Sequence, residues 1–221
     1  MPFPSELQTQ IYNYLELTLP TEQWYDLNFF TFIADVTLRK RLIVEHKNAR
    51  KIYKFFEGLA ATEDFRLAQI KTQVIMYVSI QEAVINYTLF ELFPNSIEVG
   101  KLITKKQFKE YSIPNASREK LKSELSHDGK EIICGYHTDT IVDKTKIRYE
   151  EKLKVCCELN LISPELADEL KKLYEYRNTV HLEAELRKNL SFDLDMGELA
   201  YRRVEGLSIV LSQNIANVEK Q

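Results

Sequence analysis

The sequence predicts an all-α protein, a helical bundle with a small irregular or β-hairpin-containing insertion. Of its 221 residues, 44% are hydrophobic and 29% are charged, which is enough apolar material for a real core. Only six glycines and six prolines occur, far fewer chain breaks than an all-β sandwich would need. Long stretches also carry apolar residues at helical spacing. We therefore expect a single helical domain over residues 1–221.

The first two predicted helices cover residues 5–18 and 22–58, and Pro20 lies in the break between them. Gly58 is a plausible C-terminal stop for the second stretch. Its apolar positions are imperfectly spaced around Arg41, so one long helix and two short helices both fit.

Residues 65–93 form the most hydrophobic stretch, which Pro94 ends. Polar side chains interrupt the apolar run, each at a cost in hydrocarbon, so a membrane span is not expected. Apolar side chains lie nearly all round its second half, which predicts a central helix covered on several sides by other helices. The interrupting residues are Lys71, Gln73, Gln81, Glu82 and Asn86.

The helical pattern loosens over residues 95–148, which we interpret as an insertion or connecting subregion. Residues 116–126 predict a short helix, and β-branched pairs around Gly135 predict a small hairpin within 131–142. The segment is too short and too polar for a large core of its own. Helices resume at 149–160, 164–186 and 197–218. The last stretch carries an apolar stripe formed by Ala200, Val204, Leu207, Leu211 and Ile215.

The net charge of −3 conceals strongly basic segments. Residues 39–54 contain seven basic residues and one acidic residue, and residues 101–122 contain seven basic and two acidic residues. Each segment can be merely a solvated helix face, or it can form a local surface that binds a polyanion. The predicted RNA-binding residues of the first segment are Arg39, Lys40, Arg41, Lys47, Arg50, Lys51 and Lys54.

The cysteines favour a reducing compartment. There are three, of which Cys156 and Cys157 are adjacent, and they form neither a CxxC pair nor a disulfide framework. The first residues lack the pattern of a signal peptide, so we expect a cytoplasmic protein. No motif predicts a cofactor or a metal site. The scattered histidines His46, His127 and His137 are expected at the surface.

One helix carries charged residues where apolar residues should continue. Ser163 can cap this helix and Pro164 suits its first position. At 100° per residue, Arg177 and His181 project onto the same face as Leu170. A fixed cation and a titratable imidazole on an apolar stripe are typical of a functional site.

The pair suits metal-independent RNA cleavage. His181 can act as general base or general acid near neutral pH, and Arg177 can hold the scissile phosphate. Strand cleavage needs both a general base and a general acid, and one histidine cannot easily perform both proton transfers. A symmetric homodimer would supply a second histidine. Asn178 can orient the arginine or satisfy a neighbouring carbonyl group.

The structural alternative is that these side chains only satisfy each other and their neighbours in the bundle. The acidic residues available for such pairing are Glu82, Glu151 and Glu175. We single out Glu82, on the hydrophobic stretch, as a residue that anchors Arg177 or lines the cleft.

The run YEEKLKVCCELNLISPELADELKKLYEYRNTVHLEAE, residues 149–185, resembles the C-terminal half of HEPN domains. There, two helices joined by a short turn end in an Arg-Asn…His signature, which Arg177, Asn178 and His181 match here. The resemblance implies an all-α bundle that forms a homodimer with the Arg/His motif at a shared cleft. Active ribonucleases of the family usually place four to six residues between the arginine and the histidine, whereas three lie between them here.

The resemblance also implies two classes of function. Many members are metal-independent endoribonucleases of toxin–antitoxin, phage-defence or CRISPR-linked systems, which would give this chain an RNA substrate and an antitoxin. Others are non-catalytic modules that partner nucleotidyltransferases or other proteins. A third, weaker hypothesis from the residues themselves treats 116–149 as a small wing-like nucleic-acid reader, supported only by the basic segment 101–122.

Overall fold

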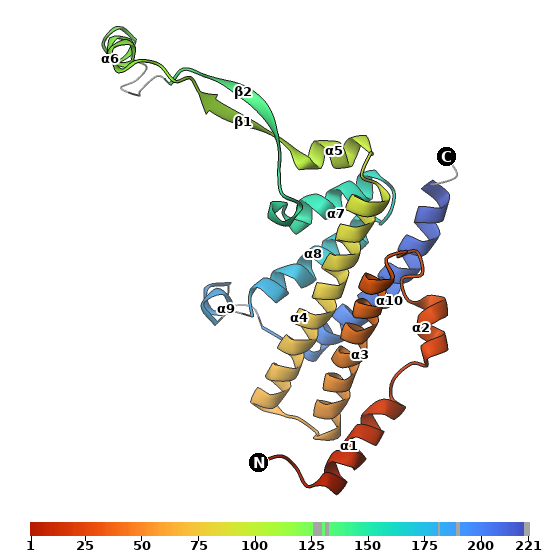
Figure 1. Cartoon of the computed structure of the whole chain (residues 1–221). Coiled ribbons are helices and arrows are strands. Elements are labelled where there is room, and N and C mark those ends of the chain that lie inside the picture. The colour runs from red at the N-terminus through yellow and green to blue at the C-terminus, as the bar shows by residue number, and fades with distance from the viewer. Residues whose placement is uncertain (126–129, 131–132, 181, 189–190, 219–221) are drawn as a thin grey trace. The chain divides into compact units, whose positions relative to one another are not determined.

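The computed structural model describes residues 1–125, 130, 133–180, 182–188 and 191–218. Over these residues the chain is mostly helical, with one two-stranded antiparallel sheet (Figure 1). This confirms the predicted helical bundle with a small insertion. The chain forms two compact units, one from residues 1–94 and 149–221 and one from residues 95–148. The smaller unit has the limits expected for the insertion.

The larger unit is a bundle around one long helix, α4 (Glu63–Tyr87), which the π-helical turn η1 (Thr88–Leu92) continues. α4 packs against α3, α7, α8 and α10, as expected for a central helix (Figure 1). No helix in the described part of the chain is long and apolar enough to cross a membrane. The other helices are α1 (Ser5–Leu17), α2 (Glu22–Asn28), α3 (Val36–Gly58), α7 (Tyr149–Glu158), α8 (Pro164–Asn178), α9 (Leu182–Lys188) and α10 (Leu194–Val218). The predicted apolar stripe of α10 is confirmed, since Ala200, Val204, Leu207, Leu211 and Ile215 are all buried.

The stretch 22–58 forms two helices, the short α2 and the 23-residue α3. The break lies at residues 29–35 and not around Arg41, where the apolar spacing is imperfect. Phe29 and Phe30 are fully buried between them, and Phe30 has a left-handed backbone with φ of 48°. The carboxylate of Asp35 then accepts hydrogen bonds from the backbone N–H groups of Thr37 and Leu38, at 2.9 and 3.0 Å. This is an N-cap, and it fixes the start of α3.

The predicted helix over 164–186 is wrong in being continuous, because α8 ends at Asn178 and a separate helix, α9, begins at Leu182. The backbone N–H of Thr179 bonds to the carbonyl oxygen of Tyr176 at 3.0 Å, and its hydroxyl donates to the same carbonyl at 2.8 Å. These bonds tighten the last turn and stop the helix. The projection that aligned His181 with the apolar stripe therefore does not apply beyond Asn178.

The smaller unit contains the sheet. Its elements are α5 (Ile97–Ile103), β1 (Thr104–Glu110), α6 (Asn115–Glu124), β2 (Gly135–Ile141) and the 3₁₀ turn η2 (Lys144–Lys146). β1 and β2 are antiparallel, with Thr104 opposite Ile141 and Glu110 opposite Gly135. The predicted hairpin within 131–142 is thus wrong, because β2 pairs with a strand that precedes α6. The sequence of β1 lacks the alternating apolar residues typical of a strand, since Phe108 is its only large apolar residue.

His46 lies in the core, so its expected surface position is wrong. The residue is fully buried, with its ring 4.8 Å from that of Phe29 and 6.0 Å from that of Tyr77. Its Nδ1 lies 2.9 Å from the hydroxyl oxygen of Tyr25. Burial, reinforced by the charge of Arg50, lowers the pKa of His46 to about 3. The imidazole is therefore neutral in the native protein.

We expect the His46→Phe variant to lose part of the acid sensitivity of the wild type. Between pH 6.5 and pH 3 the unfolded chain binds a proton at His46 that the native chain does not bind. The free energy of unfolding should fall in this window by up to about 1.4 kcal/mol per pH unit from this residue. Urea unfolding at pH 4 to 7 measures the slope, and parallel curves for the two proteins would contradict the assignment.

We expect Ser208→Ala to destabilise the larger unit by about 1–3 kcal/mol. The hydroxyl of Ser208 on α10 donates to the carbonyl oxygen of Asn28 at 3.0 Å and accepts from the N–H of Phe30 at 2.8 Å. Its loss leaves two backbone groups without a partner. Ser212→Ala is the matched control, because among the described residues its hydroxyl bonds only to the carbonyl oxygen of Ser208, one turn earlier on the same helix. Urea unfolding at neutral pH compares both variants.

Candidate functional site

The structure brings Arg177, Asn178 and Glu82 together. Arg177 and Asn178 form the C-terminal end of α8, and Glu82 lies on α4, which packs against α8. His181, the predicted acid/base residue, lies outside the described residues. The site is therefore built from the cation, its neighbours and the elements that hold them.

Glu82 and Tyr174 hold the guanidinium group of Arg177. Arg177 Nη2 lies 3.8 Å from Glu82 Oε2, the contact for which Glu82 was singled out. The hydroxyl of Tyr174 donates to Glu82 Oε1 at 3.5 Å, and the guanidinium carbon lies 5.4 Å from the centre of the Tyr174 ring. The Arg177 side chain nevertheless remains 36% exposed. It is a restrained cation that an anion can still reach.

Asn178 also contacts the guanidinium group of Arg177. Arg177 Nη1 donates to Asn178 Oδ1 at 3.1 Å. Of the two roles that the sequence left open for Asn178, this contact fits the one in which it orients the arginine.

α7 adds two buried polar residues that the sequence analysis missed. Tyr149 stacks on Tyr174 with ring centres 4.5 Å apart, and its hydroxyl is buried without a hydrogen bond in the described part of the chain. Lys152 is only 2% exposed, and its Nζ donates to Asn86 Oδ1 at 2.8 Å. One signal was available: Lys152 lies one turn from Tyr149 and one from Cys156, on the buried face of an amphipathic helix.

Burial controls the protonation of this cluster. It raises the pKa of Tyr149 well above its usual value, so that the phenol stays protonated. It also lowers the pKa of Lys152, and the nearby Glu82 carboxylate opposes that shift. The cluster thus combines one exposed cation with buried groups that keep it in place, an arrangement that can bind a phosphate or carboxylate. Among the described residues no group of His, Cys, Asp and Glu side chains is placed to hold a metal ion.

The basic residues of 39–54 lie on α3 and largely contact the protein itself. Arg39 donates to the last carbonyl oxygens of α2, those of Tyr25, Asp26 and Phe29, at 2.8 to 3.2 Å. It therefore caps the C-terminus of α2. Four other cations form ion pairs, Arg41 with Glu45, Lys47 with Glu22, Lys51 with Glu16 and Lys54 with Glu57.

The two remaining members of this basic set differ. Arg50 donates to the hydroxyl of Tyr201 and to the carbonyl oxygen of Thr18. Lys40 is exposed and makes no hydrogen bond or ion pair with the described residues. The predicted RNA contacts of this set stay a prediction, with Lys40 and the exposed Arg41 the residues most accessible to a polyanion.

Comparison with known proteins adds no relative to this description. No family model, curated protein or solved structure was found to match the chain.

We expect Lys152→Met to raise the free energy of unfolding by about 1 kcal/mol at pH 7, because it removes a buried cation that has no short-range ion pair in the described structure. The gain should shrink as the pH rises towards 10.5, where the wild-type lysine loses its proton in the unfolded chain too. Urea unfolding at pH 7, 8.5 and 10 measures it. The exposed Lys154→Met on the same helix should change stability little, and a less stable Lys152→Met at pH 7 would contradict the prediction.

Proposed function

We propose that the protein is a HEPN-like, metal-independent endoribonuclease that acts as a homodimer. The observation that carries this proposal is the position of Arg177, which is restrained by Glu82, Tyr174 and Asn178 yet remains partly exposed. It stands four residues before His181, so the cation and the imidazole belong to the same short segment.

In the proposed reaction, Arg177 binds the scissile phosphate and stabilises the charge that develops on it. His181 removes the proton of the ribose 2′-hydroxyl, whose oxygen attacks phosphorus and displaces the 5′-oxygen of the next nucleotide. The His181 of the second copy protonates that leaving oxygen. The products are a 2′,3′-cyclic phosphate and a 5′-hydroxyl. Asn178 positions Arg177, and Glu82 anchors it.

The proposed setting is a toxin–antitoxin or phage-defence system, in which an antitoxin or a nucleotidyltransferase partner restrains the ribonuclease. Lys40 and Arg41 on α3 would attract the RNA electrostatically, in the way that basic surfaces bind phosphate backbones.

The alternative is a non-catalytic dimerisation or interaction module of the same fold. The ion pair between Arg177 and Glu82 favours it, because an arginine that already has an internal carboxylate can serve packing alone. In this case Arg177→Ala would weaken the fold or the dimer, and no RNA product would form.

We expect the purified protein to cleave single-stranded or hairpin RNA in the presence of EDTA, leaving 2′,3′-cyclic phosphate ends. Arg177→Ala and His181→Ala should each reduce the rate by at least about 100-fold, the usual loss when a phosphate-stabilising or acid/base group is removed. Denaturing gels with end-labelled RNA measure the rate.

Two further variants make this experiment specific. Glu82→Gln should lower the rate about tenfold, and Glu82→Asp should restore part of it, because Glu82 only positions Arg177. Arg66→Ala is the control, since Arg66 lies in the first turn of α4 and its Nε bonds to the carbonyl of Ala61. If a folded dimer leaves diverse RNAs intact, the non-catalytic alternative replaces the ribonuclease.

A further inference from the structure

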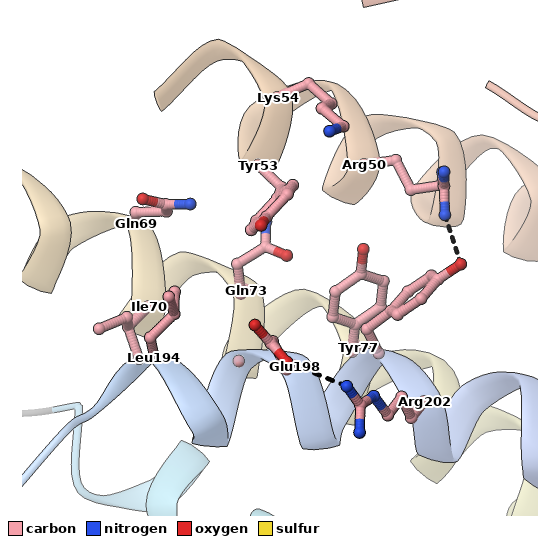
Figure 2. A pocket seen from close by; sticks show the side chains of 12 residues that line it. Arg50, Tyr53, Lys54, Gln69, Ile70, Gln73, Tyr77, Leu194, Glu198 and Arg202 are labelled. Carbon is pink, nitrogen blue, oxygen red and sulfur yellow. Dashed lines mark hydrogen bonds and ion pairs between the residues drawn. The ribbon is translucent and has the colours of Figure 1, made fainter. Parts of the chain in front are cut away.

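A cavity of about 300 Å³ lies within the larger unit, between α3, α4 and α10 (Figure 2). It is separate from the Arg177 cluster. Gln73 lines it from α4, and Glu82 follows nine residues later, so the two project in opposite directions at 100° per residue. The cavity is therefore a second candidate site, distinct from the Arg177 cluster.

The face of α4 that borders the cavity carries three polar side chains, of which only Gln73 has a hydrogen bond within the described protein. Gln69, Gln73 and Tyr77 follow one another at four-residue spacing and are only 5%, 3% and 1% exposed. The Gln73 Nε2 donates to the carbonyl oxygen of Ala49 at 2.8 Å. The Gln73 Oε1, the Gln69 amide and the Tyr77 hydroxyl make no hydrogen bond with the described residues. Because Gln69, Gln73 and Tyr77 line the cavity, a bound molecule can supply the partners that these groups lack within the protein.

The rest of the cavity combines one aromatic and two aliphatic side chains with cations. The side chains of Tyr53, Ile70 and Leu194 surround the amides, as Figure 2 shows. Lys54 on α3 and Arg202 on α10 lie on opposite sides of the cavity (Figure 2). Lys54 pairs with Glu57, and Arg202 pairs with Glu198, which also lines the cavity. The Lys54 side chain is 27% exposed and the Arg202 side chain is 70% exposed. An anionic group can therefore sit at the rim while a planar group enters.

We propose that this cavity binds a nucleoside monophosphate. Side-chain amides recognise the hydrogen-bonding edge of a nucleobase because they offer a donor and an acceptor side by side. Tyrosine rings pack against its faces, and the rim cations Lys54 and Arg202 take the phosphate. A cavity of about 300 Å³ is at the small end of ligand pockets, which fits one nucleotide and excludes an oligonucleotide. This site does not depend on whether the chain cleaves RNA.

Isothermal titration calorimetry of the 221-residue chain with AMP, GMP, CMP and UMP tests the proposal. At least one should bind with 1:1 stoichiometry, about tenfold more tightly than its nucleoside and than ribose 5-phosphate. Inorganic phosphate should bind more weakly still. If none of the four binds, or if ribose 5-phosphate or inorganic phosphate binds as tightly, the proposal is overturned.

Variants then locate the site. Tyr77→Phe and Gln69→Leu should each weaken binding about three- to tenfold and leave the fold intact, since neither removes a hydrogen bond within the described protein. Lys54→Ala should weaken binding of the nucleotide but not of its nucleoside.

The controls remove comparable groups elsewhere in the larger unit. Tyr87→Phe removes a buried tyrosine hydroxyl of α4 that bonds to the N–H of Ala34 outside the cavity. Lys154→Ala removes a lysine of α7 that pairs with a glutamate on its own helix. Both should bind the nucleotide within twofold of the wild type. Equal affinity in Tyr77→Phe, Gln69→Leu and the wild type would place any binding elsewhere and overturn the assignment.

Discussion

α4 has packed neighbours on several sides, and this constraint organises the larger unit. A polar side chain on such a helix cannot simply turn to solvent, and burying it without a partner is costly. Gln81 therefore reaches the carbonyl oxygen of Ala200 on α10 at 2.9 Å, and Asn86 accepts a hydrogen bond from Lys152 on α7. Polar contacts as well as apolar packing thus hold the surrounding helices against α4.

One carboxylate, that of Glu82, serves several groups at the α4, α7 and α8 junction. It faces Arg177 at 3.8 Å, accepts from Tyr174 at 3.5 Å and favours the charged form of Lys152. The contacts of Glu82 with Arg177 and Tyr174 are both long. The arginine is consequently held in place without being fully neutralised, which leaves it able to bind an anion.

The sequence predicted what local periodicity encodes, such as the helices over 65–93 and 197–218. It could not decide the division of 22–58, which depends on burying Phe29 and its neighbour in a core built by distant helices. The residues of the candidate site also differ in how far the sequence could identify them. Arg177 was identifiable because it interrupts an apolar stripe. Lys152 carried a weaker signal, its spacing of one turn from Tyr149 and from Cys156 on the buried face of α7. Its contact with Asn86 is apparent only once α4 lies against α7.

The bond of Ser208 to the chain at Asn28 and Phe30 joins residues about 180 positions apart. Arg50 and Tyr201 form a second such connection, and Gln81 and Ala200 a third. Contacts this distant in sequence form late, because loop closure precedes any gain from them. During synthesis on the ribosome, the surfaces of α2, α3 and α4 that contact α10 therefore stay uncovered until α10 has emerged. Nascent chains of this protein should consequently depend on chaperones more than a bundle with neighbouring contacts would.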